Sequence, residues 1–331
     1  MQNSAQFHME SKHARLTNGL TGIENTRQEK MALKWFIPCI LALLFSPEGA
    51  SGGSLKDLDR QIKEILAGQP GVYSVSYRDL ASGREWHFNA DDCMHAASTM
   101  KVPVMLRVFQ KLERENKSLN DALRVHNSFK SIVDGSAFAV DVDSDNELYQ
   151  FLGKNVPIEH LVRLMIIRSS NLATNILIDW VDAKKVTELM VELGARQTSV
   201  LRGVQDLKAF EKDMNNTTTS RDMLQILISC YQSELFTKTS RDAMIQFLLD
   251  QEFNDLIPAG IPSEANAKVA HKTGSISRVH HDAALVMLPD GSSYGLVVFS
   301  RDFGEERERV KQTIRNISSA VYQYQTQLNL Q

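Results

Sequence analysis

The chain has 331 residues, of which 43% are hydrophobic and 23% are charged, and its formal net charge is −3 at pH 7. These values describe an ordinary soluble globular protein that is long enough to bury one large core or two smaller ones. The slightly acidic balance, without a basic stripe, argues against a dedicated nucleic-acid binder.

The amino-terminal 50 residues divide into two segments. Residues 1–30 are polar and lack a periodic apolar face, so we interpret them as a disordered or non-native extension. Residues 31–50 have the layout of a secretory signal peptide: Lys34, an apolar run over 35–45, and small residues after Pro47. We therefore expect Met31 to be the true start, and we expect export to the periplasm or the medium of a bacterium. The apolar run is too short to cross a bilayer comfortably, and cleavage would remove it, so we expect no membrane span in the mature protein. The alternative is that the run stays uncleaved as an interfacial anchor.

The three cysteines show neither metal-ligand spacing nor a disulfide framework. Cys39 lies in the apolar run and would be removed with it. Cys93 and Cys230 would remain, either paired in an oxidising compartment or as free thiols.

Periodicity predicts the elements of the first part of the mature chain. A helix begins after the cap Ser54 and ends at Gly68. Two strands follow, over 73–77 and around Trp86. From Ser98 to about residue 249 the apolar pattern is helical, with loops between the helices.

The strand pattern returns in the last part of the chain. Strand-like segments cover 268–275, 283–288 and 294–300, and the turn residues 289–292 join the last two as a hairpin. A final helix places its apolar residues on one face over 310–324.

Strands at both ends of the chain and helices in the middle predict the fold class, a two-lobed α/β (α+β) fold. Residues 54–97 and 250–331 would form a discontinuous domain, an antiparallel sheet flanked by the terminal helices. Residues 98–249 would form an all-helical domain. A small molecule commonly binds in the cleft between two such domains.

The first segment with a chemical signature is Ser98-Thr99-Met100-Lys101 at the start of an apolar helix. Ser98 and Lys101 are three residues apart and share one helical face. A serine hydroxyl is a weak nucleophile until a base takes its proton, and Lys101 is that base if burial and the helix end lower its pKa. The Ser98 N–H would be an oxyanion donor. Alone, the pair is more typical of a helix cap and a surface charge.

The second segment, Ser169-Ser170-Asn171, lies between two predicted helices. Its functional interpretation makes Ser169 a proton relay towards a leaving nitrogen and Asn171 a partner for a substrate amide. Serine and asparagine are also common capping residues, which is the structural alternative.

The third segment, Lys272-Thr273-Gly274-Ser275, ends a predicted strand. An edge strand here would pair with an extended substrate, and Gly274 would leave room for it. Lys272 and Thr273 would hold a carboxylate, Lys272 would also polarise Ser169, and the Ser275 N–H would be the second oxyanion donor.

Two further groups are weaker candidates. His271, His280 and His281 are expected to be polar histidines at strand ends rather than metal ligands. The alternating aspartates of 141–145 lack the glutamate of a calcium loop, which favours a solvated acidic loop.

All three signature segments occur in the order found in class A β-lactamases and penicillin-binding proteins. Residues 96–104, 168–177, 216–219 and 271–274 resemble that family, and the resemblance runs from about Ser54 to the end of the chain. It implies Ser98 as the acylated nucleophile and Lys101 as its partner. The roles of the other segments follow the same assignment: Ser169 as relay, Asn171 as substrate binder, and Lys272, Thr273, Gly274 and Ser275 at the ligand carboxylate and oxyanion side. It implies no cofactor and no metal.

The sequence departs from the family pattern at two places. Ser170 stands where aspartate is usual. In the loop 202–216, the glutamate that normally follows Arg202 and activates the deacylating water is missing. Gln205 cannot act as a base, whereas Asp206 is either a catalytic base or a structural partner of Arg202.

These features predict a monomeric, exported serine β-lactamase whose acyl-enzyme forms on Ser98. The first alternative is a penicillin-binding-protein-like peptidase acting on a peptidoglycan D-Ala-D-Ala stem, or another serine amidase or esterase. The second is a β-lactam-binding sensor domain that stays acylated.

Overall fold

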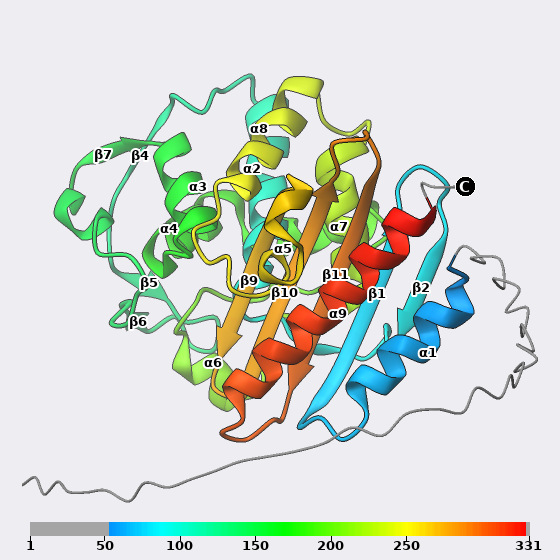
Figure 1. Cartoon of the computed structure of the whole chain (residues 1–331). Helices are drawn as coiled ribbons and strands as arrows, with labels where there is room; N and C mark the ends of the chain where they lie inside the picture. Colours follow the sequence, from blue (N-terminus) through cyan, green and yellow to red (C-terminus); the bar gives the residue numbers. More distant parts are fainter. Residues whose placement is uncertain (1–52, 329–331) are drawn as a thin grey trace, which may run out of the picture. The chain divides into compact units, whose positions relative to one another are not determined.

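A five-stranded antiparallel sheet organises the chain (Figure 1). The computed structural model describes residues 53–328, so the predicted extension, the predicted signal peptide and Cys39 lie outside the described residues. In spatial order the strands are β2 (Glu85–Phe88), β1 (Val72–Asp79), β11 (Ser293–Arg301), β10 (Val279–Met287) and β9 (Lys268–Ile276).

The pairing of the strands joins the two ends of the described chain. β1 pairs with β11 over its full length, from Val72 opposite Arg301 to Asp79 opposite Tyr294. β10 and β11 form the predicted hairpin, and β9 pairs with β10. β9 is therefore an edge strand, and this edge carries the third signature segment.

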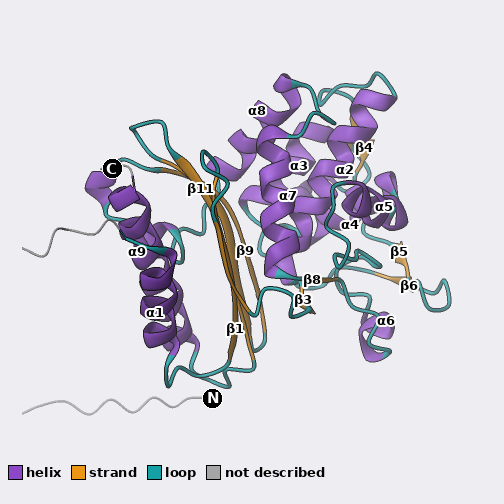
Figure 2. Cartoon of the chain, turned by 90° about the vertical axis from the view of Figure 1, so that its right-hand side faces the viewer, coloured by secondary structure: helices purple, strands orange, loops and turns teal. Residues whose placement is uncertain are grey.

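Two helices cover one face of this sheet, α1 (Leu55–Leu66) and α9 (Arg307–Leu328) (Figure 2). Ser54 begins α1 with a capping box in which its hydroxyl accepts from the backbone of Asp57. Apolar side chains of both helices pack into one cluster with the sheet, among them Leu58 and Ile314, which are fully buried. The predicted flanking of the sheet by the terminal helices is confirmed.

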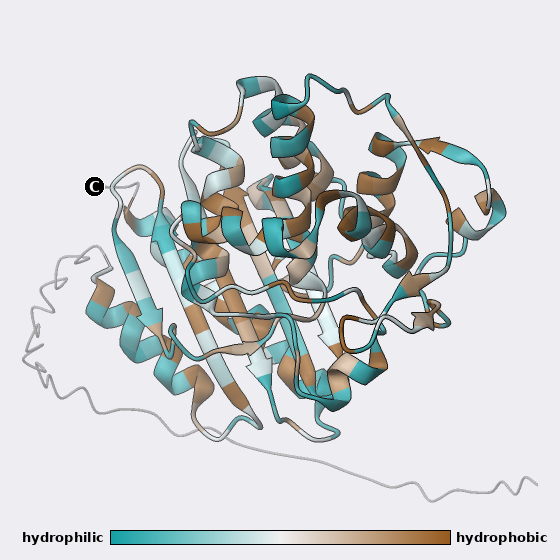
Figure 3. Ribbon diagram, turned by 180° about the vertical axis from the view of Figure 1, so that it is seen from behind, coloured by the Kyte–Doolittle hydropathy of each residue, from teal (hydrophilic) through white to brown (hydrophobic). Residues whose placement is uncertain are grey.

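The other helices lie on the opposite face of the sheet (Figure 2), and apolar residues gather where they meet it (Figure 3). They are α2 (Lys101–Arg114), α3 (Ile158–Ile167), α4 (Asn171–Val181), α5 (Ala183–Glu192), α6 (Leu207–Glu211), α7 (Ser220–Gln232) and α8 (Lys238–Leu249). The second apolar cluster joins all of these helices except α6 to Ala270, Leu285 and Val297 of the sheet.

The middle of the chain also contains short strands that periodicity did not predict. They pair as β3 (Met94–His95) with β8 (Thr217–Thr218), β4 (Ala122–Arg124) with β7 (Asn155–Pro157), and β5 (Phe129–Lys130) with β6 (Ala137–Phe138). Two or three residues are too few to display a period of two. The exact boundary between two domains remains a prediction.

The structure answers the question that the sequence left open about the cysteines. Cys93 is exposed and Cys230 is buried, and both are free thiols. Over residues 53–328, every helix is too short or too polar to cross a bilayer.

Candidate active site

Ser98 lies in a tight turn just before α2. The turn is the short 3₁₀ helix η1 (Ala97–Met100), and it opens with Ala97 in the left-handed region at φ 46°. His95 supports the turn because its Nδ1 accepts a hydrogen bond of 3.0 Å from the Ala97 N–H. Ser98 is half-buried and lines a cavity of about 440 Å³.

The Lys101 amine is completely buried behind this turn. It lies 2.6 Å from the carbonyl oxygen of Ser169, 3.1 Å from Ser169 Oγ and 3.0 Å from Asn171 Oδ1. Burial and the positive charge of Lys272 hold the pKa of Lys101 well below its usual value, against the attraction of Asp143. Burial therefore favours an uncharged amine here, the form that accepts a proton.

A second buried amine, Lys272 on β9, reaches the same hydroxyl. Its Nζ lies 3.1 Å from Ser169 Oγ and 2.9 Å from the Thr273 carbonyl oxygen. Burial lowers the pKa of Lys272 to about 7, although Asp282 opposes that shift. The Ser169 hydroxyl thus stands between two amines that both lose their protons easily.

Ser169 is held in a strained backbone conformation at φ 59°. The helices on either side fix it: α3 ends at Ile167, and α4 begins at Asn171 with Ser170 as its cap. The Ser170 hydroxyl accepts from the Ala173 N–H at 3.2 Å, as a capping serine does. The cap of α4 is therefore Ser170, whereas Ser169 and Asn171, for which capping was the structural alternative, contact the buried amines.

The loop 141–145 supplies a carboxylate to the start of α4, which the sequence did not indicate. Asp143 Oδ1 accepts from the Asn171 N–H at 2.7 Å. Its Oδ2 accepts from the Leu172 N–H at 2.9 Å and from Ser170 Oγ at 3.2 Å. A carboxylate at a helix N-terminus is favourable because it binds the free N–H groups. Asp143 is therefore a positioning residue for Asn171.

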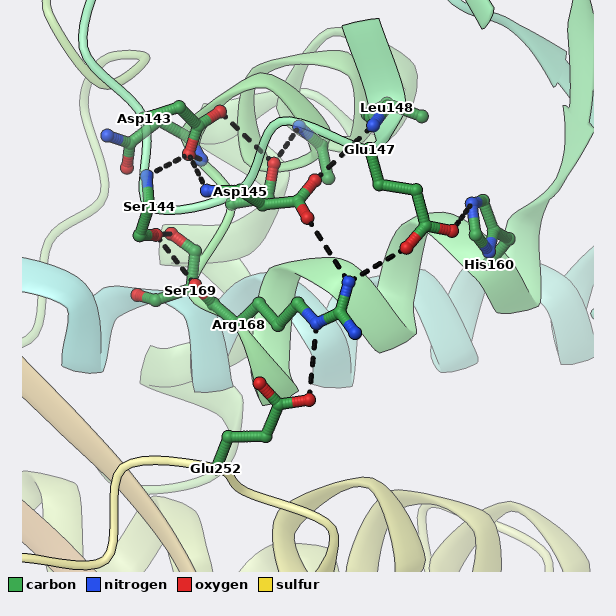
Figure 4. A network of polar contacts seen from close by, with 12 residues as sticks. Asp143, Ser144, Asp145, Glu147, Leu148, His160, Arg168, Ser169 and Glu252 are labelled. Atoms are coloured by element: carbon green, nitrogen blue, oxygen red, sulfur yellow. Dashed lines mark hydrogen bonds and ion pairs between the residues drawn. The ribbon is translucent and has the colours of Figure 1, made fainter. Parts of the chain in front are cut away.

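Other residues of this region tie the same loop to the end of α3 (Figure 4). Ser144 Oγ donates to the Arg168 carbonyl oxygen at 2.6 Å. The Arg168 guanidinium forms ion pairs with Glu147 at 2.8 Å and Glu252 at 3.2 Å, and lies 3.5 Å from the buried Asp145. The expectation of a solvated acidic loop was wrong for Asp143 and Asp145, because their carboxylates bind backbone N–H groups and side chains of neighbouring elements.

Gly274 allows β9 to approach the turn at Ser98 closely. A Cβ atom on Gly274 would lie 3.1 Å from the backbone nitrogens of Ser98 and Thr99. Such a separation forces the neighbouring backbone to shift. Glycine at this position therefore allows the predicted oxyanion donors of Ser98 and Ser275 to lie near one another.

The cavity brings the three signature segments together. Ser98, Ser169, Asn171, Thr273 and Ser275 all line it. Its remaining lining comes from segments without a motif: Val142, Asp143, Ser144, Phe253, Asp255, Leu256, His280 and Lys311. No local pattern in the sequence placed these residues at the site, since only the packing of distant elements brings them here.

Asp206 does not line this cavity. It caps α6, is 1% exposed, and accepts from Ser131 Oγ at 2.8 Å, from the Ile132 N–H at 2.9 Å and from the Ala209 N–H at 3.2 Å. It lines a separate cavity of about 240 Å³. This arrangement gives the carboxylate a structural role, although its expected partner Arg202 instead donates to Met214 O at 2.9 Å and Asn215 Oδ1 at 3.0 Å.

Gln205 connects the loop 202–216 to the loop 141–145. Its Oε1 accepts from the N–H groups of Asp141 at 2.9 Å and Val142 at 3.3 Å, and its Nε2 donates to the Val142 carbonyl oxygen. Asn171 Nδ2 donates to that same oxygen at 3.0 Å. The side chain at 205 therefore acts on the site indirectly, through the backbone next to Asn171.

The three histidines are all buried: His271 lies inside β9, whereas His280 and His281 are near the start of β10, as expected of strand-end residues. His271 Nδ1 lies 3.0 Å from Asp282 Oδ1, so it has the carboxylate neighbour that spacing alone did not reveal. Within residues 53–328, no group of three or more His, Cys, Asp or Glu side chains is arranged to hold a metal ion.

Comparisons with known proteins agree with this geometry. The family model described as "Beta-lactamase enzyme family" matches residues 57–325. A protein named "Beta-lactamase" from Bacteroides uniformis is 26% identical over 287 residues, covering 81% of this chain and 91% of that protein.

Two solved structures are similar as well. A mutant of PBP-A, described as an acyl-enzyme complex with penicillin-G, has a TM-score of 0.69 at 26% identity and covers 82% of this chain and 97% of that one. The TLA-1 extended-spectrum β-lactamase has a TM-score of 0.73 at 22% identity, covering 82% and 99%, which supports the fold alone. The chain therefore belongs to the beta-lactamase enzyme family and is a class A β-lactamase-like serine hydrolase.

Proposed function

We propose that this enzyme opens the amide ring of a β-lactam by forming an acyl-enzyme on Ser98. The Ser98 oxygen attacks the lactam carbonyl carbon, and its proton passes to the uncharged Lys101 amine. As the carbon–nitrogen bond breaks, the leaving nitrogen receives a proton through the Ser169 hydroxyl. The observation that carries this proposal is the convergence of two buried amines on Ser169 Oγ, beside the cavity that Ser98 lines.

The other signature residues would bind and orient the substrate. Thr273 and Ser275 line the cavity at the edge of the sheet, and Lys272 lies directly behind them. Two hydroxyls that can donate hydrogen bonds suit the carboxylate that β-lactams carry. Asn171 is fixed by Asp143 and Lys101, so its amide is preorganised for a substrate amide. The backbone N–H groups of Ser98 and Ser275 would stabilise the oxyanion.

The geometry supports the second step, the release of the acyl group by water, less than it supports acylation. The carboxylates that line the cavity within residues 53–328 are Asp143 and Asp255. Asp143 accepts hydrogen bonds on both oxygens, and Asp255 is paired with Lys311 at 2.9 Å. Both carboxylates thus already bind other donors, which leaves fewer sites to which a water molecule could donate. This favours a second candidate function, a penicillin-binding enzyme with a long-lived acyl intermediate, and the similarity to PBP-A points the same way.

We also propose that the enzyme acts outside the cytoplasm, as a monomer, with Met31 as its start and cleavage near residue 50. The support is the signal-peptide layout of residues 31–50. Amino-terminal sequencing of the protein recovered from the periplasm tests the cleavage. A protein that stays in the cytoplasm with residues 31–50 attached would contradict it.

The test of the activity uses the purified mature chain with penicillin-G and with a chromogenic cephalosporin. Product formation and intact mass are followed together. Sustained product supports the β-lactamase, whereas a persistent adduct on Ser98 supports the penicillin-binding enzyme. The Ser98→Ala variant should form no adduct, while the matched control Ser118→Ala, on an exposed turn after α2, should behave as the parent. Neither adduct nor product in the parent overturns the proposal.

A further inference from the structure

One polar atom beside the cavity has no role in the reaction described above. His280 on β10 is 5% exposed and lines the cavity. Its Nε2 is buried, and residues 53–328 offer it no hydrogen-bond partner. A buried unsatisfied polar atom costs free energy, so its presence calls for an explanation.

The other ring nitrogen of His280 contacts a residue of the third signature segment. Ser275 is the register partner of His280 across β9 and β10, and its Oγ lies 2.6 Å from His280 Nδ1. Two arrangements of protons satisfy this short contact. Either the hydroxyl donates to the ring and offers lone pairs to the cavity, or the ring donates and the hydroxyl proton is free to point into the cavity.

The choice between the two arrangements depends first on how many protons the His280 ring carries. Burial lowers the pKa of His280, and so do Arg307 and Lys311 of α9, whereas Asp255 and Glu308 oppose them. The adjacent His281 is itself uncharged, since burial lowers its pKa to about 4. His280 is therefore neutral at pH 7 and carries one ring proton.

The position of that single proton follows from the unpartnered Nε2. A proton on Nε2 would be a buried donor with no acceptor among the described residues, and buried N–H groups without a partner are rarer in proteins than buried acceptors without one. The proton then resides on Nδ1, and the ring donates to Ser275 Oγ.

We propose that His280 is a positioning residue that holds the Ser275 hydroxyl as a hydrogen-bond donor towards the carboxylate of the ligand. This rests on the proposed function, because it concerns the binding of an acylating β-lactam. A hydroxyl that donates to a carboxylate attracts it, whereas one that presents only lone pairs repels it. His280 thereby contributes to the preference for ligands that carry a carboxylate, without touching the reacting atoms.

The test compares two ligands that differ only in this group, benzylpenicillin and its methyl ester. We expect His280→Leu to lower the second-order rate constant of acylation by benzylpenicillin ~10-fold, about 1.4 kcal/mol, through weaker binding rather than a slower chemical step. With the methyl ester the same variant should stay within ~2-fold of the parent. His280→Asn places an amide donor near the Nδ1 position, so it should recover most of the loss.

A double-mutant cycle with Ser275→Ala tests whether His280 acts through that hydroxyl. In the Ser275→Ala background, His280→Leu should cause no further loss with benzylpenicillin. The matched control is His87→Leu, because His87 Nδ1 lies 3.1 Å from Ser76 Oγ in a similar pair outside the cavity. This control should acylate as the parent does.

Three results would overturn the proposal: an equal loss with the methyl ester, additive losses in the cycle, or no recovery in His280→Asn. The failure of the proposed function is distinguishable, because the parent chain would then form no adduct with either ligand.

Discussion

The edge of the sheet at β9 and the loop 202–216 both contain polar side chains that family resemblance marks as functional. The two regions differ in the groups that these side chains contact. Beside the β9 edge, Lys272 of β9 and Lys101 of α2 meet a single hydroxyl, and burial lowers the pKa of each. In the loop 202–216, Asp206 has hydrogen-bond donors on both oxygens and caps a helix. The first arrangement keeps groups reactive at a cost in stability, whereas the second stabilises the fold. The difference lies in the partners and not in the residue types.

The largest effect should come from removing the buried base. Lys101→Met keeps the length of the side chain but cannot accept a proton, so acylation of Ser98 by penicillin-G should slow by roughly 10²–10⁴-fold. Stopped-flow acylation followed by intact mass measures this. The matched control Lys111→Met changes a lysine of the same helix that pairs with Glu115, and it should acylate normally. Acylation within tenfold of the parent in Lys101→Met would assign the base to another group.

The lowered pKa of Lys272 should also appear in the pH dependence of stability. Between its folded pKa of about 7 and the unfolded value near 10, the unfolded chain binds one more proton than the native chain. The contribution of Lys272 to the free energy of unfolding should therefore rise with pH, by about 1.4 kcal/mol per pH unit in that window, and fall again as the pH drops towards 7.

Urea unfolding of the parent and of Lys272→Met between pH 7.5 and 9.5 tests this contribution. The variant should show a smaller slope of stability against pH, while the part due to Lys101 remains. Identical slopes in the two proteins would mean that Lys272 keeps its charge in the native state.

Asp206→Asn tests whether the carboxylate in the loop 202–216 has a structural role. Its amide would place a donor against the Ile132 N–H or the Ser131 hydroxyl, so the free energy of unfolding should fall by about 1–3 kcal/mol. The lifetime of the acyl-enzyme, measured by intact mass after removal of free penicillin-G, should not change. A selective slowing of deacylation would return Asp206 to a catalytic role.

The smallest effect should come from adding a methyl group at Gly274, where β9 closely approaches the turn at Ser98. In Gly274→Ala the new methyl group would press on the nitrogens of Ser98 and Thr99, and the turn must shift by a few tenths of an ångström. We expect acylation to slow by roughly 3–10-fold, about 1 kcal/mol, with thermal unfolding nearly unchanged. A normal acylation rate would show that the turn yields without loss of alignment.

The parts of the molecule that the sequence predicted well are those with local causes. Ser54 begins α1, alternation marks β1, and the turn 289–292 joins β10 to β11, because each depends on residues close together in the chain. The signature segments were recognisable for the same reason, as each is a short string at an element boundary.

The parts that could not be predicted depend on approaches between distant segments. Asp143 contacts the start of α4 only because the loop 141–145 folds back on it, and the acidic composition of that loop suggested exposure. His280 meets Ser275 through strand pairing, and Asp206 is buried by the segment around Ser131. Each of these contacts is set by register or packing, which no local pattern encodes.

The anchoring of Asn171 by Asp143 has a consequence for how relatives of this protein are judged. Shortening the 141–145 loop by one residue would withdraw the carboxylate from the α4 amides while leaving every signature letter intact. A homologue with intact motifs and such a deletion would lose this support of Asn171, and a screen that scores only those letters would not detect the loss.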